Sequence, residues 1–167
     1  MDETTELYQN TGYSFDRIQR RTLVLDVAIG DGVDVGLGKT FDETLQEPLI
    51  IDKLSDIYLD NFTTYDALPT TGGSSLSSFL IGIDQLNIKT ATNNAIFKDK
   101  VSIPNESTGD NAHKVHKGKK YNFICTINPT VLAKLSGTIT NIAATPAVAF
   151  DGDGRFILEL LIISRDI

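Results

Sequence analysis

The chain of 167 residues is long enough for a single domain whose hydrophobic core needs no disulfide framework. Its apolar content of 41% and charged content of 22% are those of a globular protein and exclude a wholly disordered chain. The net charge of −7 argues against a general nucleic-acid-binding protein, because such proteins usually carry a basic surface.

The N-terminal segment is predicted to be an extended arm. Residues 1–20 are polar, with their few apolar side chains at irregular spacing, and they contain no apolar run of the kind found in signal peptides. Nowhere does the chain contain the roughly 20 apolar residues that a membrane helix needs. We therefore expect one domain over residues 21–167, synthesis in an intracellular, reducing compartment, and no membrane span.

The first part of this domain alternates strand signals with one helix signal. Thr22–Ile29 is a β-branched run and predicts the first strand. Thr40–Glu47 predicts a short helix, with carboxylates in its first turn and a proline directly after it. Leu49–Leu59 then predicts a long strand with an irregularity near Ser55.

The middle of the chain predicts two further strands. In Phe79–Thr90 the apolar residues change phase near Asp84, which indicates a long strand with a β-bulge. Ala95–Ile103 is a weaker strand ended by Pro104.

The stretch Tyr121–Ile142 is predicted to form the centre of the fold. Apolar residues recur at every second position on both sides of Asn128 and Pro129, the period of a strand with one buried face. The proline interrupts the run, so the stretch reads as two core strands with a short connector. Arg155–Arg165 is apolar in both phases and predicts a last strand that is covered on both faces.

Taken together, the pattern predicts about eight strands and at most one or two short helices. The two long polar loops, residues 69–78 and 105–120, favour Greek-key crossings over a simple meander. The predicted fold is therefore all-β: a two-sheet antiparallel β-sandwich, most specifically an eight-stranded single jelly roll.

Two glycine-containing segments resemble ligand-binding loops but lack essential residues. Gly32–Thr40 ends in Gly-Lys-Thr, but Val33 stands where a phosphate-binding loop needs its first glycine. Asp151–Gly154 begins like a calcium loop, but the apolar residues that follow supply no further ligands, so a tight turn is predicted there.

The remaining polar features give no catalytic, cofactor or metal site. Cys125 lies mid-strand and is interpreted as a small buried apolar residue. His113 and His116 have a spacing that some zinc sites use, but no cysteine or carboxylate flanks them. Their loop is either a solvated segment or a contact patch for an acidic partner, and the candidate contact residues are Lys114, Lys117, Lys119 and Lys120.

Several segments together resemble a known protein family, the small single jelly-roll capsid proteins of large icosahedral DNA viruses. Most of the likeness lies in Tyr121–Cys125, the Asn-Pro that follows, and Leu135–Thr140. The resemblance covers roughly residues 48–165, and its other segments are Ser55–Phe62, Phe79–Asn94, Ile103–Glu106 and Lys120–Ile142.

This resemblance implies a structural protein of the virion, either a penton protein at five-fold vertices or a minor capsid protein beneath or between capsomers. Its partners would be the major capsid protein and other capsid subunits, with a homopentamer in the shell, no direct nucleic-acid contact and no cofactor. Synthesis would take place in the host cytoplasm. Family members have no catalytic motif.

Two other functions remain open from the residues alone. A free-standing carbohydrate- or receptor-binding sandwich has the same fold class, although this chain has no tryptophan for stacking on a sugar. A jelly-roll enzyme of the cupin type would need a cluster of metal-binding histidines, and this chain has two histidines in all.

Overall fold

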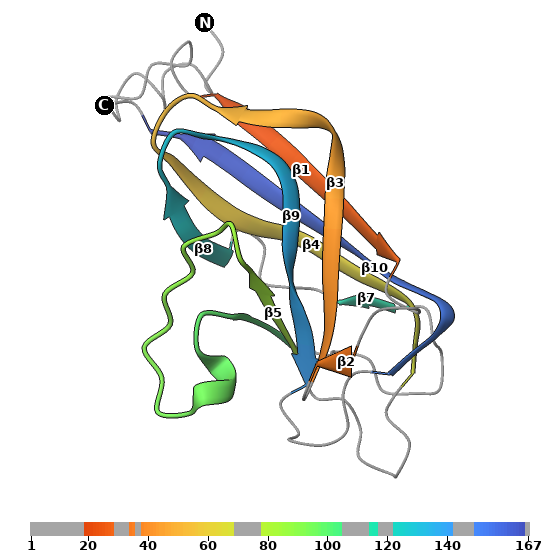
Figure 1. Cartoon of the computed structure of the whole chain (residues 1–167). Coiled ribbons are helices and arrows are strands. Elements are labelled where there is room, and N and C mark those ends of the chain that lie inside the picture. Colours follow the sequence, from red (N-terminus) through yellow and green to blue (C-terminus); the bar gives the residue numbers. More distant parts are fainter. Residues whose placement is uncertain are drawn as a thin grey trace, which may run out of the picture.

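The computed structural model describes residues 19–28, 34–35, 38–68, 78–104, 114–116, 122–141 and 149–165. They form two antiparallel sheets that face each other across one hydrophobic core (Figure 1). The elements are β1 (Arg20–Ala28), β2 (Asp34–Val35), β3 (Gly38–Ile51), β4 (Ser55–Leu68), β5 (Ser78–Ile83), a 3₁₀ helix η1 (Ala95–Phe97), β6 (Val101–Pro104), β7 (Lys114–His116), β8 (Asn122–Ile127), β9 (Thr130–Asn141) and β10 (Ala149–Ser164).

The sheet topology is that of a jelly roll. In the first sheet, here the β4 sheet, the strand order is β1-β10-β4, and both β8 and the short β7 pair with β4. In the second, the β9 sheet, the order is β2-β3-β9-β5-β6. Neighbouring strands are thus mostly distant in sequence, and the chain crosses repeatedly from one sheet to the other. The predicted eight-stranded sandwich is confirmed, with β2 and β7 as short additions.

The core is built from side chains at every second strand position. Four phenylalanines connect the two sheets: Phe41 and Phe79 come from the β9 sheet, and Phe62 and Phe156 from the β4 sheet. The ring of Phe62 lies 5.2 Å from that of Phe79, and Phe156 lies 5.6 Å from Phe41. All four are at most 6% exposed, so this cluster joins the sheets through contacts between residues far apart in sequence.

The helix predicted for Thr40–Glu47 is wrong, because this segment is part of β3. Gly38–Thr44 pairs residue by residue with β9, and Phe41 points into the core. Packing against the opposite sheet therefore overrides the local helix signal. Pro48 lies in the short stretch between Thr44 and Leu49 where the register shifts, a position where its missing N–H interrupts no ladder.

Three predicted strand boundaries also need correction. Leu49–Leu59 is two strands in different sheets, separated by residues 52–54. In Phe79–Thr90 the phase change is the end of β5 at Ile83 and not a bulge, and the chain then leaves the sheet. Ala95–Ile103 contains η1 and only the first residues of β6.

The tight turn predicted for Asp151–Gly154 is also wrong. These residues lie within β10, where the register with β4 shifts between the pairs Phe150–Ala67 and Arg155–Tyr65. The extra residues therefore form an irregularity in a continuing strand and do not reverse the chain.

The two core strands predicted within Tyr121–Ile142 are confirmed as β8 and β9, but they belong to different sheets. Their connector is Asn128-Pro129, as expected. In β10 the inward side chains are buried, whereas the outward Ile157, Leu161 and Ile163 are half-buried, so the prediction of full cover on both faces holds for the inner face alone.

The connections between strands differ at the two ends of the sandwich. At one end, residues 52–54 and 128–129 make short turns. The backbone N–H of Ser164 also donates to the Gln19 carbonyl at 3.0 Å, so the beginning of β1 and the end of β10 are neighbours there. At the other end lie Ala28, Leu68, Ser78, Pro104, Asn141 and Ala149. The predicted loops at 69–78 and 105–120 fall outside the described residues, apart from Ser78 and the three residues of β7.

Candidate functional site

The outer face of the β4 sheet carries a row of apolar and aromatic side chains. Leu161 of β10 pairs with Tyr58 of β4, which pairs with Phe123 of β8. The Tyr58 and Phe123 rings meet edge to face, with centroids 5.8 Å apart and planes at 71°. Phe123 is 52% exposed, so part of this apolar row faces solvent.

Two charged pairs lie on the same face. Arg165 donates from Nε and Nη2 to the two carboxylate oxygens of Asp56, at 2.9 and 2.7 Å. The hydroxyl of Thr126 donates to the same carboxylate at 2.7 Å, and Arg155 pairs with Asp26 at 3.3 Å. Burial would raise the pKa of Asp56, but the hydrogen bonds from Arg165 and Thr126 and the charge of Arg165 together lower it.

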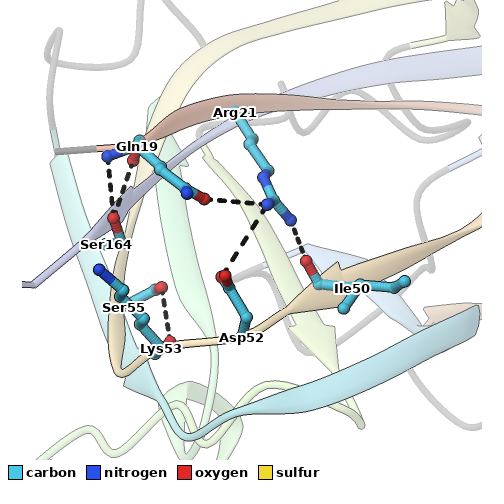
Figure 2. Close-up of polar contacts among 7 residues, drawn as sticks. All are labelled: Gln19, Arg21, Ile50, Asp52, Lys53, Ser55 and Ser164. Carbon is cyan, nitrogen blue, oxygen red and sulfur yellow. Dashed lines mark hydrogen bonds and ion pairs between the residues drawn. The ribbon is translucent and has the colours of Figure 1, made fainter. Parts of the chain in front are cut away.

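A polar cluster closes the short-turn end of the sandwich (Figure 2). The guanidinium of Arg21, in β1, donates to the Ile50 carbonyl of β3 and to the Gln19 side chain, and it lies 3.9 Å from Asp52. The backbone N–H of Gln19 donates to the Ser164 hydroxyl at 2.9 Å. Because β1 and β3 belong to different sheets, Arg21 joins the two layers at their rim. Its partners are internal, which gives this cluster a structural role.

The outer face of the β9 sheet has a different feature, a hollow of about 440 Å³. Its floor is formed by Gly82 of β5 and Thr138 of β9, which are paired across the two strands. Its wall is the segment that follows β5 and returns to β6, and this segment contributes Lys89, Lys98 and Lys100. We call this feature the Lys100 hollow.

Lys100 is half-buried, whereas the other two lysines of this hollow are exposed. Its ammonium lies 3.5 Å from the Thr140 hydroxyl, and within the described part of the chain no carboxylate pairs with it. Burial lowers the pKa of Lys100 below its usual 10.5, because desolvation disfavours the charged form. The preceding residue, Asp99, has the positive φ of 57°, which turns the backbone sharply between Lys98 and Lys100.

The basic residues predicted as a partner contact lie mostly outside the described residues. Lys114 begins β7 and its backbone pairs with Thr64, but its side chain is not described, and Lys117, Lys119 and Lys120 lie outside the described ranges. His113 lies outside them as well, whereas the His116 backbone pairs with Phe62. The contact-patch prediction therefore stays a prediction.

Sequence reasoning missed the Lys100 hollow. Its lysines lie in two segments whose patterns predict strands, Phe79–Thr90 and Ala95–Ile103, and Lys89 is 11 positions from Lys100, so no compact basic motif is visible. Only the fold of the segment onto β5 and β9 brings these residues to one hollow.

Cys125 is confirmed as a buried residue. Burial, and to a smaller degree the charge of Asp56, raises the pKa of its thiol to about 11. Such a thiol holds almost no thiolate at neutral pH and is a poor nucleophile.

Among the residues that the structure describes, no group of three or more histidine, cysteine, aspartate or glutamate side chains is placed to hold a metal ion. In the same ranges no helix has the length and apolar character needed to cross a bilayer. Comparison with protein-family models, with curated proteins and with solved structures gives no match for this chain.

Proposed function

We propose that this chain is a structural subunit of an icosahedral viral capsid, either a penton protein or a minor capsid protein that binds neighbouring capsomers. The observation that carries the proposal is the jelly-roll topology, with β1-β10-β4-β8 facing β3-β9-β5-β6 around a filled core. It supports the architecture that the resemblance of Tyr121–Ile142 to jelly-roll capsid proteins implies.

The division of the molecule into two ends supports the same role. Short turns and the contacts of Arg21 hold the two sheets together at one end, so the sandwich is suited to act as a rigid building unit. The strand ends at the other end lead into long polar segments, among them residues 105–121 with their lysines. Such a unit can form a closed ring in which each subunit contacts the next through the same pair of surfaces. Many individually weak contacts then stabilise the assembly through multivalency.

The proposal is tested by the mass of the native assembly, measured by light scattering or native mass spectrometry on the full chain. A pentamer supports the vertex position. A monomer that binds to larger capsid particles supports the minor capsid position. A chain that stays monomeric and does not bind to such particles contradicts the proposal.

The basic segment gives a sharper variant of this test. Charge reversal at Lys117, Lys119 and Lys120 is expected to impair assembly. The basic segment of one subunit would attract the otherwise acidic body of the next subunit, and the reversal would turn this attraction into repulsion. Circular dichroism checks that the monomer remains folded. Unimpaired assembly would show that these lysines are not the contact.

The alternative is a β-sandwich that binds carbohydrate or a receptor. The observation in its favour is the exposed Phe123 beside Tyr58 on a sheet face. However, the 71° between the two rings gives no flat platform for a sugar. Binding to a glycan array would favour this alternative, and the Phe123→Ala variant should then lose the signal.

A further inference from the structure

Among the described residues, no carboxylate lies within ion-pair distance of the Lys100 ammonium. This ammonium is partly withdrawn from water, and its one described polar partner is the neutral hydroxyl of Thr140, at a long 3.5 Å. A charge that is partly buried usually has an opposite charge beside it, since desolvation otherwise destabilises it. The Asp56 carboxylate, whose side chain is 17% exposed, follows that rule, because Arg165 lies 2.7 Å from it.

The remaining groups of the hollow are suited to an anion. Lys89 and Lys98 line it together with Lys100, against the two carboxylates of Asp84 and Asp99. The Asp84 carboxylate already accepts a hydrogen bond from the Ser136 hydroxyl at 2.9 Å. The positive charge in the hollow therefore exceeds the negative charge, and one of the two carboxylates has a partner within the chain.

Gly82 keeps the floor of the hollow open. A Cβ atom at this position would lie 3.5 Å from both Lys100 Cγ and the Thr138 hydroxyl, which is ordinary van der Waals contact. An alanine is thus sterically tolerated, and its methyl group would occupy space next to the two groups best placed to contact a ligand. The Gly82→Ala variant can therefore alter the floor of the hollow without disturbing the strands around it.

We propose that the Lys100 hollow is a binding site for an oxyanion, the anionic oxygens of a phosphate or carboxylate group, with Lys100 as the principal charge and Thr138 as a hydroxyl partner. Lysine suits this role as a compact point charge with three donors. The volume of about 440 Å³ accommodates a small molecule that carries such a group as well as the free ion. The proposal does not depend on the capsid role.

The test is a titration of the isotopically labelled full chain with inorganic phosphate, followed by NMR at constant ionic strength. The expected result is saturable shifts of the amide signals of Gly82, Asp99 and Lys100. A parallel titration with acetate distinguishes the two sources of the oxyanion: preference for phosphate identifies a phosphoryl ligand, and preference for acetate identifies a carboxylate. Absence of saturable shifts with both probes overturns the proposal.

Three variants locate the site. Lys100→Met retains the length of the side chain and should weaken binding at least tenfold, about the loss of one charge-assisted hydrogen bond. Gly82→Ala should weaken it by a smaller factor through the added methyl group. The matched control is Lys53→Met, which removes the same charge from the exposed turn between β3 and β4 and should leave affinity unchanged. Equal affinity in Lys100→Met and the unaltered chain, or equal weakening in Lys53→Met, overturns the proposal.

Discussion

The Asp56–Arg165 pair on the β4 sheet and the Lys100 hollow on the β9 sheet differ in how their charges are satisfied. On the β4 sheet, Arg165 and Arg155 bind Asp56 and Asp26 of the same chain. On the β9 sheet, Lys100 lies in a hollow and no described carboxylate pairs with it. The difference separates charges that are paired within the fold from one that has no described carboxylate partner, and it directs the search for a ligand to the Lys100 hollow.

The largest expected effect lies in the core that supports both faces. Phe156→Ala should destabilise the protein by about 3–5 kcal/mol, since it removes a fully buried ring that contacts both Phe41 and Phe62. Urea unfolding followed by circular dichroism measures the change. A loss below about 1 kcal/mol would mean that the two sheets do not meet as described.

The β9 sheet has its own sensitive point at Gly137. A methyl group there would overlap the Gly82 carbonyl oxygen and lie 2.8 Å from Phe41 Cζ, so the backbone of β5 or β9 must shift. Gly137→Ala should therefore cost about 3 kcal/mol by overpacking. Gly82→Ala, the matched control, meets its neighbours at 3.5 Å and should change stability far less. Equal effects of the two variants would contradict the close approach of these strands.

The aromatic pair on the β4 sheet should contribute less. A double-mutant cycle of Tyr58→Ala and Phe123→Ala is expected to give a coupling energy of about 0.5–1 kcal/mol, because the edge-to-face contact is half exposed. Thermal or urea unfolding of the four proteins measures it. Strictly additive losses would show that the rings do not interact in solution.

The smallest effect concerns the Asp56 carboxylate and depends on pH. Its folded-state pKa lies below the ordinary 3.8, so it contributes stability that is complete above pH 3.8 and disappears as pH falls through the lowered pKa. Asp56→Asn should therefore lower stability at pH 7, and the difference from the unaltered protein should shrink below pH 3.8. A difference that is the same at pH 7 and pH 2.5 would contradict the ion pair with Arg165.

Strands with a clear two-residue period were predictable from the sequence, and so was the jelly roll that they form. β1, β8 and β9 follow that period, and Pro129 marks the turn between the last two. Thr40–Glu47 was not predictable as strand, because its partner residues in β9 lie about 90 positions away. Asp151–Gly154 has the composition of a turn, and only its pairing partners on either side keep it in a strand.

The Lys100 hollow was unpredictable for a related reason. Its floor comes from Gly82 and Thr138, which become neighbours only through the pairing of β5 with β9. Its lysines give no local motif, and the lysine cluster that is visible in the sequence, at residues 114–120, lies outside this hollow.

The contrast between these two sites is tested most directly by the pKa of the Lys100 side chain, measured by NMR titration with and without inorganic phosphate. Without phosphate, we expect a pKa below the ordinary value of 10.5, because burial disfavours the charged ammonium and no described carboxylate pairs with it. With phosphate, the pKa should rise, because a bound anion stabilises the charged form. An ordinary pKa that phosphate leaves unchanged would contradict the account.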